Sequence, residues 1–110
     1  MALALIAVTG ANTDSAIIAA PGAGKAIQIE FLEFTVSAAA TVSVTNGADG
    51  ATTRLIYGDF AANSGVVVNG TGGRMDYKPF ATLSSNTALN MTNSAGNLKG
   101  SVQYVIVNTV

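Results

Sequence analysis

Residues 19–26, AAPGAGKA, carry the residue types of a phosphate-binding loop. Such a loop has the pattern G-x-x-x-x-G-K-[ST], in which backbone amides and the lysine hold phosphates and the hydroxyl binds magnesium. Gly24 and Lys25 match this pattern, but alanine stands at the first glycine position and at the hydroxyl position. Lys25 also leads into an alternating sequence, not into a helix whose N-terminus would bind an anion. The segment therefore predicts a tight corner between two strands, in which Gly22 and Gly24 take positive φ.

Few of the remaining residues could catalyse a reaction. The chain has no histidine and no cysteine, which excludes Ser–His and Cys–His nucleophiles and zinc sites with nitrogen or sulfur ligands. Glu30 and Glu33 could act as paired carboxylates if a strand irregularity brought them to one face, but their pattern favours two solvated side chains. Asp49 and Asp59 lack the spacing of a calcium loop, and we expect them to accept local backbone N–H bonds in turns. We therefore expect no enzyme, no metal and no cofactor.

The segment RMDYKPF, residues 74–80, alternates charged side chains with large apolar ones. In an extended strand Arg74 and Lys78 would lie on one face and Tyr77 on the other. One interpretation is edge protection, because lysine and proline limit unwanted growth of a sheet. The other is a contact strip, because arginine and tyrosine are enriched at binding hot spots. Tyr57 and Phe60, in the sequence YGDF, are a second candidate pair of contact residues.

A hydrophobic period of two runs through most of the chain, as expected for half-buried strands. The clearest segments are SAIIAA, ATVSVTN, ATTRLIYG, SGVVVNG, TALNMTN and SVQYVIVN, and turns rich in glycine and asparagine separate them. In KAIQIEFLEFTVS the apolar phase slips near Phe31 and Leu32, which predicts a β-bulge. We expect one all-β domain over residues 1–110, a β-sandwich or jelly roll of about seven to nine short antiparallel strands.

Charged side chains are scarce. Only 10% of the 110 residues are charged while 49% are apolar, and the formal net charge is −1; about 25% charged residues is usual. This composition predicts either a surface of hydroxyls and amides or, as the favoured interpretation, a surface covered by partner subunits. It gives no electrostatic reason to expect a nucleic-acid partner. The longest apolar run is shorter than the roughly 20 residues that cross a membrane, so we expect no membrane partner.

The N-terminal segment MALALIAV has no charged side chain. It lacks the basic start of a signal peptide, so we interpret it as a strand of the chain's own core. The alternative is an extended arm, over residues 1–10, that adds to the sheet edge of a partner. As an arm it would offer four contact residues to a neighbouring subunit: Ala2, Leu3, Leu5 and Ile6.

The segment IIAAPGAGKAIQIEFLEFTVSAAATVSV resembles small structural proteins of tailed phages. In that family a strand, an Ala-Pro-Gly-x-Gly-Lys corner, a long strand and a strand rich in Ala, Thr and Val follow one another. The segments NSGVVVNGTGG, LSSNTALNMTN and GSVQYVIVNTV are similar to the same family. The resemblance implies a capsid decoration (cement) protein, which is typically a homotrimer. Such a protein sits on the outer surface of the virion and ties neighbouring subunits of the major capsid protein together.

Two other functions stay open from the sequence. The first is a receptor- or carbohydrate-binding β-sandwich module of a phage tail or fibre, with aromatic rings as stacking platforms. Its candidate platforms are Tyr57, Phe60, Tyr77 and Phe80. The second is a secreted bacterial pilus or surface-layer subunit, against which the missing export signal counts.

Overall fold

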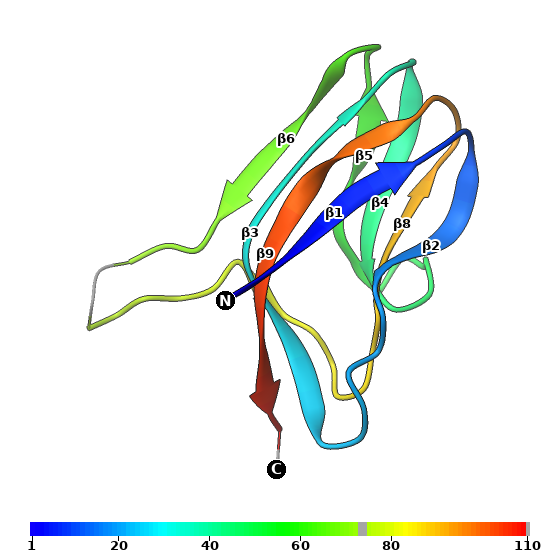
Figure 1. Cartoon of the computed structure of the whole chain (residues 1–110). Coiled ribbons are helices and arrows are strands. Elements are labelled where there is room, and N and C mark those ends of the chain that lie inside the picture. The colour runs from blue at the N-terminus through cyan, green and yellow to red at the C-terminus, as the bar shows by residue number, and fades with distance from the viewer. Residues whose placement is uncertain (73–74, 110) are drawn as a thin grey trace.

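The computed structural model describes residues 1–72 and 75–109. Within them the chain forms strands and turns, with nine strands in chain order (Figure 1). The strands are β1 (Ala2–Val8), β2 (Asn12–Ile18), β3 (Lys25–Val36), β4 (Ala40–Asn46), β5 (Arg54–Phe60), β6 (Ser64–Asn69), β7 (Ala81–Thr82), β8 (Leu89–Asn93) and β9 (Leu98–Asn108). The expected all-β class is therefore confirmed.

Two antiparallel sheets share these strands. Sheet A has the order β1-β9-β3-β6, with the short β7 pairing with β3, and sheet B has the order β2-β8-β4-β5. Most consecutive strands lie in different sheets, and the exceptions among the described residues are β4 and β5 in sheet B and β6 and β7 in sheet A. Antiparallel strands wound across two packed sheets in this order form a jelly roll. In Figure 1 sheet A lies in front of sheet B.

The long strand β3 contains the expected bulge. Its register with β9 shifts between Ile29 and Phe31, which leaves Glu30 as the extra residue. Before the bulge Ile29 is fully buried, and after it Leu32 and Phe34 are buried. The bulge thus moves the core-facing set from odd-numbered to even-numbered residues, as the slip in apolar phase predicted.

The corner between β2 and β3 also matches its prediction. Gly22 has φ 111° and Gly24 has φ 75°, conformations that glycine adopts at little cost. The Lys25 N–H donates to the Gly22 carbonyl at 3.2 Å, which closes the turn immediately before β3 begins. The glycine-rich segment is a structural turn.

Apolar side chains from both sheets fill the space between the layers. The largest fully buried ones are Ile27, Ile29, Leu32, Phe34, Val36, Val42, Val44, Leu89, Met91, Leu98 and Val102. Phe34 of sheet A meets Phe60 of sheet B edge to face, with ring centroids 5.4 Å apart. Among residues 1–72 and 75–109 no helix has the length and apolar character needed to cross a membrane.

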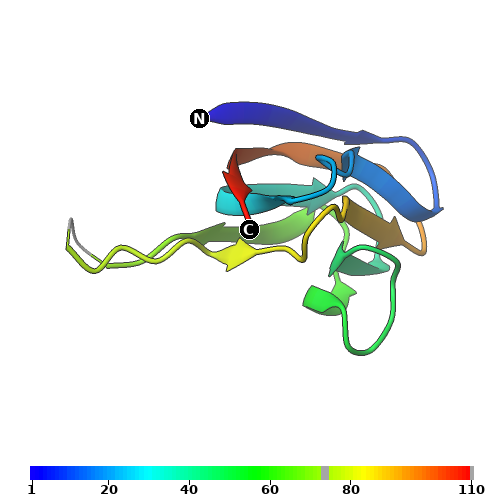
Figure 2. The same ribbon diagram turned by 90° about the horizontal axis from the view of Figure 1, so that it is seen from below.

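Residues 75–80, the described part of the segment predicted as a strand, instead belong to a hairpin that leaves the sandwich between β6 and β7 (Figures 1 and 2). Thr71 and Lys78 exchange backbone hydrogen bonds of 2.8 and 2.7 Å, which join its two limbs. At its base the Gly70 N–H donates to the Glu30 carbonyl at 2.9 Å, and the Phe80 N–H donates to the Ile29 carbonyl at 2.9 Å. The hairpin is therefore anchored beside the bulge of β3. Arg74, a predicted contact residue, lies outside the described residues.

Candidate interaction surfaces

The outward face of sheet A carries large apolar side chains on its edge strand β1. Leu3 is 61% and Leu5 is 72% exposed, whereas Ile6 and Val8 point inward and are buried. The strand pairs with β9 from Ala2 to Val8 without a register shift. Residues 2–8 are thus a regular strand of the chain's own sheet, as the core-strand interpretation expected, and the free-arm alternative is corrected.

A row of outward side chains crosses the middle of sheet A from edge to edge. The register places Leu5 opposite Ser101, Ser101 opposite Glu33, and Glu33 opposite Val67 of β6. The Ser101 hydroxyl donates to the Glu33 carboxylate at 3.3 Å, and Val67 is 60% exposed. In this row the two edge strands therefore present aliphatic side chains, while the central strands between them present polar ones.

Beside Val67 the outward face of sheet A is hollowed by about 380 Å³. Gly65 and Gly100 are among the residues that line it. A Cβ at Gly65 would collide with the backbone carbonyl of Phe34, and one at Gly100 would collide with that of Glu33. The two glycines therefore allow β6 and β9 to approach β3 closely.

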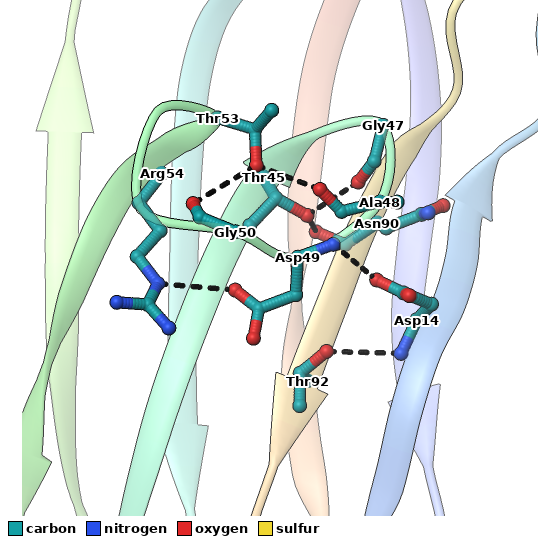
Figure 3. Close-up of polar contacts among 10 residues, drawn as sticks. All are labelled: Asp14, Thr45, Gly47, Ala48, Asp49, Gly50, Thr53, Arg54, Asn90 and Thr92. Atoms are coloured by element: carbon teal, nitrogen blue, oxygen red, sulfur yellow. Dashed lines mark hydrogen bonds and ion pairs between the residues drawn. The ribbon is translucent and has the colours of Figure 1, made fainter.

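Sheet B has a polar outward face that the loop between β4 and β5 partly covers (Figure 3). Ser43 and Thr45 of β4 point to this face, yet they are 2% and 0% exposed. The Thr45 hydroxyl donates to the Gly47 carbonyl at 2.7 Å, and the Thr53 hydroxyl donates to the Ala48 carbonyl at 2.6 Å. Hydroxyl groups thus fold the loop back onto the sheet that it leaves.

Asp14 fastens the same loop to strand β2. Its carboxylate accepts a hydrogen bond of 2.8 Å from the Asp49 N–H, and its own N–H donates to the Thr92 hydroxyl at 2.9 Å (Figure 3). Asp14 has φ 52°, a left-handed conformation that aspartate adopts more readily than most residues. One residue therefore joins β2, β8 and the loop between β4 and β5.

Arg54 lies between Asp49 and Tyr57. Its Nε is 3.1 Å from Asp49 Oδ1, and its guanidinium lies 3.8 Å from the centroid of the Tyr57 ring, within the range of a cation–π contact. The hydrogen bond to Arg54 lowers the pKa of Asp49, and the same bond raises the pKa of Arg54. Both charges are thus held in their ionised forms, and the ring of Tyr57 remains 56% exposed beside them.

A second hollow, of about 420 Å³, opens next to this ion pair. Its lining includes Tyr57, Arg54, Asp49, Thr41, Ser43 and Thr92. An aromatic ring surrounded by hydroxyl, carboxylate and guanidinium groups offers a stacking surface together with many hydrogen-bonding partners. Such a surface is suited to a polyhydroxylated ligand.

The hairpin between β6 and β7 is the third exposed feature. Met75 is 99% and Tyr77 is 47% exposed. The Tyr77 hydroxyl donates to the Glu30 carboxylate, and this bond raises the pKa of Tyr77. The bulge residue Glu30 therefore fixes the return limb of the hairpin by its side chain and the outgoing limb by its carbonyl.

The sequence-predicted contact residues that the structure describes divide into two groups. The residues that lie exposed are Ala2, Leu3, Leu5, Tyr57, Tyr77 and Lys78. Ile6 is only 2% exposed, and Phe60 packs against Phe34 in the core. Strand alternation turns Ile6 inward, so its side chain is closed to a partner, and the ring of Phe60 is partly buried where it joins the two sheets.

The acidic residues also differ from expectation. The Asp49 carboxylate bonds Arg54, and that of Asp59 accepts a 2.6 Å bond from the Thr41 hydroxyl, so these two side chains bind neighbouring side chains instead of local backbone N–H groups. Glu33 is exposed, whereas Glu30 is half-buried. No group of three histidine, cysteine or acidic side chains within the described residues could hold a metal ion.

Sequence reasoning missed Val67 and Asp14. A signal for Val67 was present, because three consecutive valines in SGVVVNG must place at least one on the outward face. The role of Asp14 has no local signal, since its partners Asp49 and Thr92 lie far along the chain.

Comparison with known proteins identifies no relative. No protein-family model matches the chain, and neither a curated protein nor a solved structure does.

Proposed function

We propose that the chain is a structural protein of a phage particle, a capsid decoration protein that acts as a homo-oligomer, expected to be a trimer, on the outer surface of the head. The observation that carries this proposal is the set of aliphatic side chains, Leu3, Leu5 and Val67, more than half exposed along the two edges of one sheet. An exposed apolar edge on a body with 10% charged residues is typical of a surface that partners cover.

The mechanism would be multivalent. A single contact of millimolar affinity contributes about −4 kcal/mol. Several such contacts on one rigid oligomer raise the local concentration of each and multiply the overall affinity by about 10² to 10⁴. We assign the contact with the major capsid protein to the hairpin between β6 and β7, since it projects from the sandwich and exposes Met75.

The test is co-sedimentation of the purified protein with empty phage heads. We expect wild-type protein to sediment with the heads, and Met75→Ser to weaken this binding by about tenfold, the equivalent of about 1.4 kcal/mol. Tyr57→Ser on sheet B is the control and should bind heads as wild type does. Absence of wild-type protein from the head fraction would contradict the proposal.

A second candidate function is carbohydrate binding, which the hollow beside Tyr57 favours. Its volume of about 420 Å³ lies within the ordinary range of small-ligand sites. A glycan panel tests this function. Binding that Tyr57→Ser abolishes would support it, and absence of binding to every glycan of the panel would count against it. Because Tyr57 is the control for head binding, the two functions are separated by one variant.

A further inference from the structure

The two edge strands of sheet A lack the features that keep edges apart. Edge strands expose unpaired backbone groups, and natural sheets protect them with charged side chains, proline, bulges or very short strands. β1 (ALALIAV) and β6 (SGVVVN) contain no charged residue and no proline. Both pair with their neighbours in sheet A without a register shift. Both edges are therefore regular templates for another strand.

By comparison with sheet A, the edges of sheet B carry protective features. β2 has two register irregularities and contains Asp14 in a left-handed conformation. β5 carries Arg54 and Asp59, and the pairing of β4 with β5 shifts register near Arg54. Within one sandwich the protective features thus lie on sheet B, and the unprotected edges lie on sheet A.

The directions of the strands allow the two edges of sheet A to meet. Each neighbouring pair in the order β1-β9-β3-β6 is antiparallel, so β1 and β6 run in opposite directions. A rotation about an axis parallel to the strands keeps the direction of every strand. Copies related in this way place β6 of one beside β1 of the next in the antiparallel sense, and the two strands match in length, with six and seven residues.

The side chains at the two edges also match. Leu3 and Leu5 of β1 and Val67 of β6 all point to the outward face of sheet A. When β6 of one copy joins β1 of the next, these aliphatic side chains become cross-strand neighbours on one face. The contact would cover the exposed apolar residues of both edges and satisfy their open backbone groups together.

We propose that β6 of one copy pairs with β1 of the next, so that sheet A continues from subunit to subunit. The partner is a second copy of this chain, and the inference rests on the homo-oligomeric state in the proposed function. A contact between two different patches closes a ring when the rotation allows and otherwise extends as a filament. A ring of three copies is the form that corresponds to a trimer.

Native mass spectrometry of single lysine variants tests this contact. Leu5→Lys places a charge on β1, and Val67→Lys places one on β6. Ala16→Lys, at an exposed position of β2, is the matched control. We expect a multiple of the 11.0 kDa chain mass for wild type and Ala16→Lys, and a single chain for each of the other two variants. Circular dichroism establishes that each variant is folded.

Mixing the two blocked variants distinguishes this contact from others. The Leu5→Lys chain keeps an intact β6 and the Val67→Lys chain keeps an intact β1, so the mixture should form a pair of one chain of each kind. A contact of β1 with β1 would instead let Val67→Lys assemble alone. The inference is overturned if that happens, if wild type is monomeric, if either variant keeps the wild-type mass, or if the mixture stays monomeric.

These outcomes are independent of the head-binding experiment. An oligomer that ignores phage heads would defeat the proposed function and leave the β6–β1 contact standing. A monomer that binds heads would overturn the β6–β1 contact and the homo-oligomeric part of the proposed function, and it would leave the decoration of heads standing.

Discussion

Each sheet has four main strands, but the outward faces differ: sheet A exposes aliphatic side chains at its edges, and sheet B is polar. Sheet A is regular along both edges and exposes Leu3, Leu5 and Val67 there. Sheet B has irregular, charged edges, and a loop held by Asp14 covers part of its outer face. Because an open edge can pair with another chain, the proposed β6–β1 contact would explain this difference: the edges of sheet B are protected within one subunit, and those of sheet A would be covered by a second copy.

The largest effect should come from Phe34, which joins the two sheets. Phe34→Ala removes a ring that is 2% exposed, and we expect it to lower the free energy of unfolding by about 3–5 kcal/mol. Phe60→Ala, on the sheet B side of the same ring pair, should cost less because Phe60 is only partly buried. Urea denaturation measures both. Equal losses would mean that the core depends on the two sheets alike.

Substitution of one glycine in each sheet compares how closely the backbones pack in the two sheets. In sheet A, a Cβ at Gly100 would meet the Glu33 carbonyl, whereas in sheet B nothing lies within 4 Å of a Cβ at Gly58. Gly100→Ala should therefore cost about 1–3 kcal/mol, and Gly58→Ala should stay within about 0.5 kcal/mol of wild type. Urea midpoints of the two variants provide the measurement. A neutral Gly100→Ala would show that β9 and β3 can separate freely.

Substitution of Asp14 tests whether this residue holds the loop between β4 and β5 over sheet B. Asp14→Ala removes the acceptor of the Asp49 N–H and places alanine in a left-handed conformation, so we expect a loss of about 1–2 kcal/mol. Asp14→Gly also removes the acceptor, but glycine adopts the left-handed conformation at little cost. We therefore expect this variant to be destabilised less than Asp14→Ala. Hydrogen exchange should quicken at residues 46–53 in both variants. Unchanged exchange there would mean that Asp14 does not hold the loop.

The smallest effect concerns the ion pair of sheet B. Because Arg54 lowers the pKa of Asp49 below its ordinary 3.8, the pair stabilises the fold above that ordinary value. This contribution is lost as the pH falls through the lowered pKa. The difference in Tm between wild type and Asp49→Asn should be constant from about pH 7 to pH 5 and shrink below about pH 4. A difference that persists undiminished at lower pH would contradict this role.

Local patterns predicted the strands and their turns well. The phase slip in β3 and the positive φ of Gly22 and Gly24 follow from side-chain period and glycine content, which act over a few residues. The hairpin was missed because the sequence of residues 74–80 alternates like a strand, yet among the described residues of this stretch only Lys78 forms a bridge, to Thr71. Alternation describes a strand only where a neighbouring strand is present to pair with it.

The surfaces were harder to predict than the fold. Ser43 and Thr45 alternate with valines as solvated residues would, but the loop that buries them depends on Asp14, which is distant in sequence. Of the candidate contact residues, Leu3, Leu5 and Tyr57 lie exposed and Ile6 is buried. An arm and a core strand have the same composition, so only the pairing of β1 with β9 shows that Ile6 points inward.

The most direct measurement is hydrogen exchange of the wild-type protein over a range of concentrations. If copies join through sheet A, peptides of β1 and β6 will exchange more slowly as the concentration rises, while those of β2 and β5 will not change. Exchange that is independent of concentration in all four strands, or slowed only in β2 and β5, would contradict the assignment of assembly to sheet A.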